Sequence, residues 1–162
     1  MLDIKTVDID KDLETQIVIG HAGFIKTAED LYETMITSAP GIKFGIGFVE
    51  ASGACLVRSE GNDDALRQRA ELNALNIGAG HVFVIMFKNA YPINVNNALK
   101  DVSEVVSIYC STANPVQVLV AETDQGRGVI GIVDGYRPKG VETNEDKAKR
   151  KKLVRDLGYK VQ

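Results

Sequence analysis

The chain has 162 residues, of which 44% are hydrophobic and 25% are charged, and its formal net charge is −3. This length and composition predict a single globular domain covering residues 1–162, large enough to bury a core without help from disulfides or metals. The slightly acidic balance leaves no basic surface for a polyanion, so we expect no nucleic-acid partner.

The first third of the chain predicts three strands and one helix. β-branched residues cluster at positions 4–8 and 16–20, as is typical of strands. A helix is predicted from Thr27, whose hydroxyl can act as the N-cap, to Ser38, just before a Pro-Gly pair. Residues 43–50 then alternate apolar side chains with lysine and two glycines. Because glycine weakens a strand, two on one face indicate close approach by a packed neighbour or by a ligand.

The middle third predicts a short strand, a helix, a buried strand and a second helix. The short strand covers residues 55–58, and an Asn-Asp-Asp sequence then caps a helix that runs to about Ala74. Residues 81–88 are almost continuously apolar, which predicts a central strand buried on both faces. The following helix is expected over residues 94–102, with Asn94 as its N-cap.

The last third predicts a hairpin and a terminal helix. The two strands of the hairpin cover residues 116–122 and 128–134, and the segment between them contains a glycine. A helix follows from about Thr143 to Leu157, where Gly158 supplies a left-handed cap and a run of lysines and arginines forms a solvated face. This order of elements predicts an α/β fold, in which helices pack on a mixed and mostly buried β-sheet within one layered domain.

Neither the cysteines nor the histidines form a metal-binding pattern. Cys55 and Cys110 lie in apolar runs, where free thiols usually pack as small hydrophobic side chains. There is no CxxC motif, and His21 and His81 are far apart in the sequence, so we predict no metal. The first residues do not resemble a secretory signal, and no uncharged apolar run has the length of about 18 residues that a membrane span requires. We therefore expect a cytoplasmic protein without a membrane partner.

The strongest candidate for a ligand site is the Gly-Ala-Gly-His sequence formed by Gly78, Ala79, Gly80 and His81. Glycines one residue apart permit backbone conformations in which consecutive N–H groups converge on an anion. A histidine beside such a concavity can hydrogen-bond a phosphate, act as an acid or base, or attack phosphorus through a ring nitrogen. The same pattern before a strand also occurs in simple turns, so both interpretations stay open.

Four further polar residues are candidates for contacts with the same ligand. Arg127, between two glycines, suits a bidentate phosphate or carboxylate contact, or it is the solvated tip of a hairpin. Asp134 lies at the carboxyl end of a predicted strand and can bind a ribose or cap the turn after it. Asn94 can recognise a base edge or cap its helix, and Lys26 can place a point charge next to a phosphate.

Blocks distributed along the whole chain resemble one protein family. They are FIKT at 24–27, EDLYE at 29–33, KFG at 43–45, EASG at 50–53, LVR at 56–58, IGAGH at 77–81, YPIN at 91–94, TANP at 112–115, GRG at 126–128 and DG at 134–135. With these blocks the chain resembles the small prokaryotic family of adenosine-specific kinases.

The resemblance implies an α/β domain that assembles as a homo-oligomer, with a trimer expected, binds adenosine or AMP and carries a phosphorylatable histidine. The Gly-Ala-Gly block assigns that histidine to His81, with His21 as the alternative. The chain contains neither a P-loop nor a recognisable kinase signature, so the phosphoryl donor is unknown and turnover is left open. The first hypothesis is an adenosine-recognising phosphotransfer protein, and the alternative is a non-catalytic sensor of adenosine or AMP.

Overall fold

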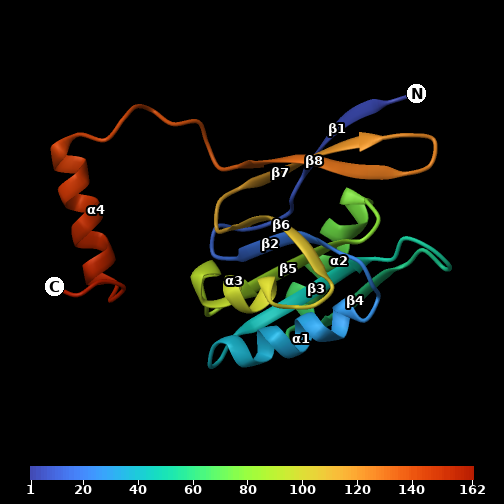
Figure 1. Cartoon of the computed structure of the whole chain (residues 1–162), viewed down its shortest axis with the longest axis horizontal. Coiled ribbons are helices and arrows are strands. Elements are labelled where there is room, and N and C mark those ends of the chain that lie inside the picture. The colour runs from blue at the N-terminus through green and yellow to red at the C-terminus, as the bar shows by residue number, and fades with distance from the viewer.

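The computed structural model describes residues 1–162 and divides eight strands between two antiparallel sheets (Figure 1). In chain order, the elements are β1 (Asp3–Asp8), β2 (Gln16–Ala22), α1 (Thr27–Ser38), β3 (Lys43–Val49), β4 (Val57–Gly61), α2 (Asp64–Ile77), β5 (Val82–Lys88), α3 (Pro92–Lys100), β6 (Val105–Thr112), β7 (Val116–Glu122), β8 (Arg127–Asp134) and α4 (Asn144–Asp156). The larger sheet has the order β4-β3-β5-β2-β6, and the smaller sheet has the order β1-β7-β8.

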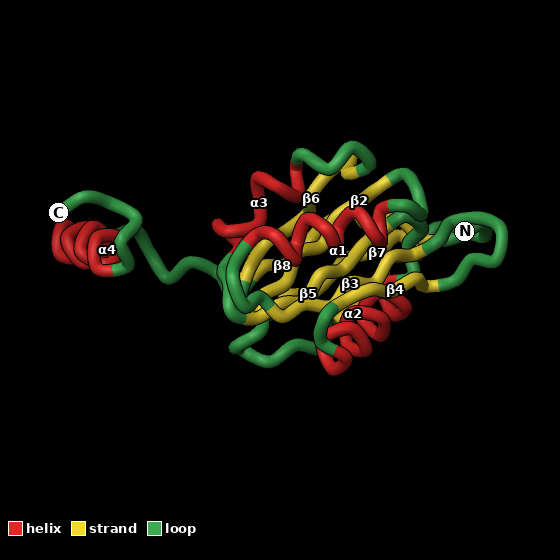
Figure 2. The backbone as a smooth tube through the Cα atoms, turned by 90° about the horizontal axis from the view of Figure 1, so that it is seen from below, coloured by secondary structure: helices red, strands yellow, loops and turns green.

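The larger sheet is buried on both faces because a different layer covers each face. One face packs against α1 and α3, which contribute Leu31 and Val95 to its core. The other face packs against α2 and the smaller sheet, which contribute Leu66 and Val118. Figure 2 shows α1 and α3 on one side of the larger sheet and α2 on the other. The predicted central buried strand is confirmed, because β5 lies in the middle of this sheet and only its last residue is not fully buried.

The two glycines of β3 admit a helix directly onto the strand. A Cβ at Gly45 would lie 2.2 Å from the backbone nitrogen of Arg67, and a Cβ at Gly47 would lie 2.6 Å from the carbonyl oxygen of Ala70. Both contacts are far shorter than van der Waals packing permits, so only glycine allows α2 this close. Of the two explanations that the sequence left open for this face, the packed neighbour is confirmed.

Three predicted helix starts can be compared with the observed caps. The cap of α2 is as predicted, since the Asp63 carboxylate accepts a hydrogen bond of 3.0 Å from the Leu66 amide. Thr27 is not a cap, because it already lies inside α1 and its buried hydroxyl has no partner. The prediction that α3 starts at Asn94 was also wrong. The capping residue is Tyr91, and Asn94 lies inside the helix, where its Oδ1 accepts a 2.9 Å bond from the Tyr91 amide.

The predicted burial of the two cysteines is correct for only one of them. Cys110, in β6, is buried, whereas Cys55 is exposed. The apolar letters around Cys55 suggested a strand, but β4 begins only at Val57. Cys55 instead closes a turn by donating its amide to the Ser52 carbonyl at 3.2 Å and adopts a φ of 51°. This turn directs the thiol outward.

The α/β class with helices packed on a buried sheet is confirmed, and the strand arrangement differs from the predicted single mixed sheet in two respects. All strand pairs are antiparallel, and the predicted hairpin of β7 and β8 does not join the larger sheet. It pairs with β1 from the other end of the chain, in register from Asp3 opposite Glu122 to Asp8 opposite Gln117. The sequence did not reveal this pairing because it joins residues more than a hundred positions apart.

The C-terminal helix α4 lies apart from the rest of the chain. Residues 135–143 form an extended connection with no helix or strand, and α4 stands at its end (Figures 1 and 2). The helix starts after Thr143, as predicted, and Gly158 has the expected left-handed φ, 85°. No residue of α4 is buried. None of the helices combines the length and apolar character that crossing a bilayer requires.

Candidate functional site

His81 lies beside His21 at one end of the larger sheet. His21 is the penultimate residue of β2, and His81 immediately precedes the adjacent antiparallel strand β5, so the strand pairing brings them together. The two ring centroids are 5.8 Å apart, and the rings meet edge to face at 73°. The other neighbour of the His81 ring is Phe48 of β3, which stacks on it at 5.9 Å and 20°. Both imidazoles are half-buried, so neither is sealed inside the core.

The backbone holds His81 in an uncommon conformation. Its φ is 67°, a left-handed value that residues with a Cβ rarely adopt and that costs about 1 kcal/mol. Two hydrogen bonds fix it, because the His81 amide donates to the Val49 carbonyl at 2.8 Å and the His81 carbonyl accepts from the Ala22 amide at 2.9 Å. Such conformations gather at functional sites, where a fixed side-chain direction compensates for the strain.

The environment of His21 keeps its imidazole uncharged. Burial lowers the pKa of His21, and the neighbouring His81 lowers that pKa further. Both effects act in the same direction, since desolvation and nearby positive charge each disfavour the imidazolium. His21 is therefore neutral at neutral pH and keeps one ring nitrogen free to accept a proton.

The loop before His81 has fewer free N–H groups than the sequence suggested. Gly78 has a φ of 61° and ends α2, and its amide donates to the Ala74 carbonyl at 2.9 Å. The His81 amide is also engaged, whereas the amides of Ala79 and Gly80 make no hydrogen bond within the chain. Of these two residues only Gly80 lines the pocket described next, whereas Ala79 is buried.

A pocket of about 780 Å³ adjoins the same loop. It lies between the end of α2, the loop joining β3 to β4, and the hairpin of β7 and β8, and its lining includes Gly78, Gly80, Arg127, Glu50 and Cys55. Its volume falls within the range of about 300–1,000 Å³ that small-molecule sites occupy. Neither imidazole lines the pocket, so residues 78–80 separate it from the histidine pair.

Arg127 connects the hairpin to the end of α2. Its Nε donates to the Glu122 carboxylate at 2.8 Å, and its Nη1 donates to the Asn76 and Ile77 carbonyls at 3.1 and 3.3 Å. Those carbonyls form the negative end of the helix dipole, which a guanidinium stabilises. Arg127 lines the pocket, but most of its hydrogen-bonding capacity is already used within the chain.

Lys26 belongs to the same end of the larger sheet as the histidines. It forms ion pairs with Asp30, one turn further along α1, and with Glu104 at 3.2 Å. Hydrogen bonds from its ammonium to these two carboxylates raise the pKa of Lys26. The Glu104 carbonyl accepts a bond of 3.0 Å from the Gly23 amide, two residues after His21. Lys26 is therefore linked through Glu104 to the segment that follows His21, and its charge is compensated.

The structure does not bring the other two predicted ligand residues to the pocket. Asp134 accepts a 3.1 Å hydrogen bond from the side chain of Asn114. It ends β8, whereas Arg127 begins it, so the two are about 20 Å apart at the rise of an extended strand. Asn94, in α3, is engaged with the Tyr91 backbone. Neither lines the pocket.

The pocket also contains residues that the sequence did not identify as ligand contacts. Glu50 accepts bonds from the Leu56 amide at 2.9 Å and from the Arg58 guanidinium at 3.0 Å, and so fixes the loop joining β3 to β4. Cys55 lies in this loop. The left-handed turn at Cys55 leaves no recognisable signal in the sequence. The block at 50–53 is the one sign that this loop matters.

Fold and site together define an α/β protein with a ligand-sized pocket beside a pair of histidines. The chain belongs to the family described as adenosine specific kinase, which it matches over residues 7–160. The resemblance inferred from the sequence is thus confirmed. A protein of Pyrococcus horikoshii OT3 solved by crystallography, PH1918, is 48% identical and superposes with a TM-score of 0.96 over 100% of both chains. Comparison with curated proteins gives no match.

Proposed function

We propose that this protein binds adenosine or AMP in the pocket beside residues 78–80 and passes a phosphoryl group through His81. The family to which the chain belongs is described as adenosine specific kinase, a description that supports adenosine recognition and phosphoryl transfer. The observation that carries the proposal is the pair of half-buried imidazoles, 5.8 Å apart. Gly80 lines the pocket and His81 is the next residue. Because neither imidazole lines the pocket, the mechanism requires the 5′ end of the ligand to extend past residues 78–80 to the histidine pair.

The chemistry assigned to the pair has two steps. A ring nitrogen of His81 attacks the phosphorus of a donor, and a P–N bond forms as the bond from phosphorus to the donor's leaving oxygen breaks. The 5′-hydroxyl of adenosine then attacks the phosphohistidine, and the P–N bond breaks as AMP forms. His21, kept neutral by burial, accepts the hydroxyl proton.

We propose that the protein acts in the cytoplasm as a homo-oligomer, a trimer, without a nucleic-acid or membrane partner.

A second function, a sensor that binds adenosine or AMP without turnover, has its own support. Arg127 and the amides of Gly78 and His81 are engaged in bonds within the chain. Few groups are left to hold a triphosphate, and the sequence has no motif for one. In the sensor, the histidines would only hydrogen-bond the ligand.

Labelling with phosphate donors distinguishes the two functions. The wild-type protein is incubated with ³²P-labelled nucleotide donors, and acid-labile protein-bound phosphate is measured. His81→Asn is the informative variant, since asparagine accepts the left-handed backbone but has no nucleophilic nitrogen. The proposal expects label on the wild type and on His21→Asn, and none on His81→Asn.

The remaining outcomes are equally decisive. If label persists on His81→Asn and disappears from His21→Asn, the phosphorylated residue is His21. If no donor labels the wild type, while adenosine or AMP raises its melting temperature, the protein is a sensor. If neither label nor stabilisation is found, both functions are wrong.

A further inference from the structure

Charge is divided unequally between two parts of the chain. Residues 1–134, which we call the body, contain 18 acidic and 10 basic residues, a net charge of −8. Residues 135–162, which we call the arm, contain four acidic and nine basic residues, a net charge of +5. Opposite charges of this size attract one another.

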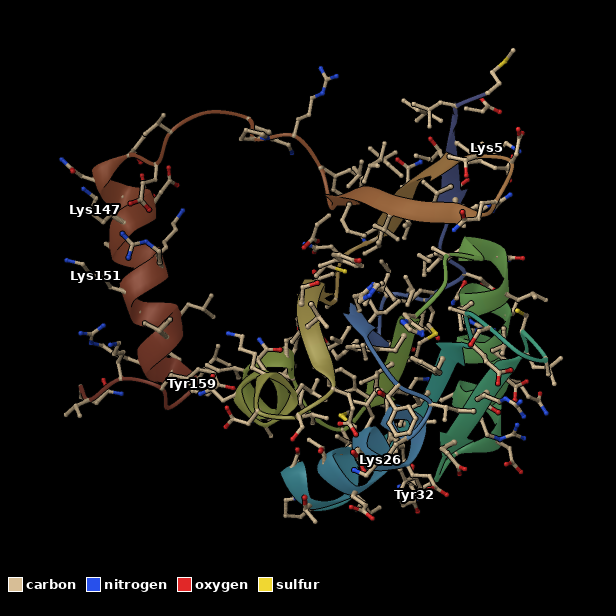
Figure 3. All side chains as sticks on the ribbon, turned by 45° about the vertical axis from the view of Figure 1, so that its right-hand side comes forward. Lys5, Lys26, Tyr32, Lys147, Lys151 and Tyr159 are labelled. Atoms are coloured by element: carbon tan, nitrogen blue, oxygen red, sulfur yellow. The ribbon has the colours of Figure 1, made fainter.

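Within one chain, the positive arm does not pair with the negative body. No hydrogen bond or ion pair joins residues 136–162 to the body, and the ion pairs of α4 are all within the arm. Lys147 and Lys151, one turn apart, take part in no ion pair, and they project from α4 away from the body (Figure 3). On the body, Glu29, Glu33 and Glu60 line a hollow beside Tyr32 and have no cationic partner.

The arm also exposes apolar side chains that a free helix would not need. Leu153 is 57% exposed and Leu157 is 58% exposed, and these residues are one turn apart on the same side of α4. Tyr159 adds an aromatic ring next to them in sequence. A helix of 13 residues is only marginally stable in water without packing. An apolar stripe on a basic helix is therefore suited to an acidic protein surface.

The position of the arm is shared with a protein whose structure was determined in a crystal. The P. horikoshii protein superposes over its whole length with a TM-score of 0.96. The arm makes up 28 of 162 residues, and a differently placed segment of that size would lower the score well below this value. The arm of that protein is thus extended in the same direction. A helix that makes no hydrogen bond or ion pair with its own body, yet lies in the same place in two related structures, points to contacts with another molecule.

We propose that the arm of one copy docks on the body of a second copy of this chain. Leu153 and Leu157 pack on the partner's surface, and the unpaired lysines face its carboxylates. The body is the complementary surface because it carries the excess negative charge that matches the arm. A nucleic acid would use the basic face but would leave the leucines in water. The proposal is independent of any nucleotide chemistry at His81.

Energy transfer between two labelled populations tests the docking directly. In a Cys55→Ser background, one population carries a donor dye at Lys149→Cys in the arm, and the other carries an acceptor at Glu33→Cys on the body. Because donor and acceptor are on different chains, transfer after mixing reports association between copies, and its loss in an arm variant assigns that association to the arm. Leu153→Glu in the donor population should weaken the association roughly tenfold or more, because it removes a leucine that docking buries.

The matched control is Ala148→Glu, which places the same charge on the same exposed helix, about 140° around its axis from Leu153. It should leave the energy transfer unchanged. Trypsin provides a second readout, since the arm is rich in lysine and arginine. Docking predicts that the wild-type arm and Ala148→Glu resist cleavage, while Leu153→Glu is cut rapidly. The proposal is overturned if mixed populations show no transfer, if Leu153→Glu behaves like Ala148→Glu, or if all arms are cleaved alike.

Discussion

Three non-glycine residues adopt positive φ values, and two of them lie at or next to the pocket. They are Cys55 at 51°, His81 at 67° and Asn89 at 66°. Asparagine adopts this region readily, so Asn89 needs no special explanation. Cys55 lines the pocket, and His81 immediately follows Gly80, which also lines it. The two less common positive φ values therefore occur around the same pocket. Backbone strain of this kind supports this location of the site independently of the family comparison.

The two thiols should differ strongly in reactivity. Burial raises the pKa of the Cys110 thiol to about 12, so it is protonated and shielded, whereas Cys55 is exposed. Because the thiolate is the reacting species, Ellman's reagent should modify one thiol per native chain, and Cys55→Ser should abolish that reaction. The unfolded protein should react twice. Two rapid equivalents in the native protein would contradict the burial of Cys110.

The pH dependence of stability should contain a contribution from His21. Its pKa is lowered on folding by burial and by His81, so the unfolded chain binds more protons below about pH 6.5. Stability that is complete above this pH is therefore lost as the pH falls toward the folded-state pKa. Urea midpoints between about pH 5 and 7.5 should fall less steeply with decreasing pH for His21→Gln than for the wild type. Identical slopes would show that His21 is not the group responsible.

At the level of elements, local patterns predicted most helices and strands but not their partners. The apolar run of β5 and the Asp63 cap of α2 are local signals, and both were identified correctly. β6 was missed because its exposed and buried residues do not alternate regularly, and its pairing with β2 is interrupted by two register shifts. The histidine pair was missed for a related reason. Sixty residues separate His21 from His81, and only the pairing of β2 with β5 brings them together.

The contact of α2 with β3 should be among the least tolerant in the molecule. Gly45→Ala places a Cβ 2.2 Å from the Arg67 nitrogen, so helix and strand must separate. Overpacking of this kind should lower the free energy of unfolding by about 3 kcal/mol. Gly128→Ala is the control, because a Cβ there meets nothing within 4 Å, and it should change stability by less than about 0.5 kcal/mol. Urea denaturation of both variants measures the difference, and equal values would refute the close contact.

For the molecule as a whole, the pocket lies where its layers meet. Gly126 and Gly128 come from the hairpin of the smaller sheet, whereas Gly78 and Ala74 come from α2 on the larger sheet. A chain of charges crosses this junction, from Lys5 through Glu122 to Arg127 and the α2 carbonyls. The geometry of the pocket thus depends on how the two sheets are joined, a property that no single segment of sequence encodes.

Removing Arg127 tests that junction. Arg127→Met keeps the aliphatic stem but loses the bonds to Glu122 and to the end of α2. It should destabilise the protein by about 1–2 kcal/mol, the usual cost of charge-assisted hydrogen bonds at a helix end. The control is Lys149→Met, which removes an exposed ion pair with Glu145 and should cost less than about 0.5 kcal/mol. Equal midpoints for the two variants in urea would contradict the role assigned to Arg127.

Salt should control how strongly copies associate, because the arm and the body carry net charges of +5 and −8. The Debye length falls from about 8 Å at physiological ionic strength to about 3 Å at 1 M, which screens the charges of the partially exposed contact. Raising sodium chloride should therefore weaken the energy transfer between mixed copies and speed tryptic cleavage of the arm. The apolar contact of Leu153 opposes this trend, and sulfate strengthens it, so sodium sulfate at equal ionic strength should weaken docking less than chloride does. If sodium chloride strengthened docking instead, the apolar contacts of the leucines would drive the association, and attraction between arm and body charges would not.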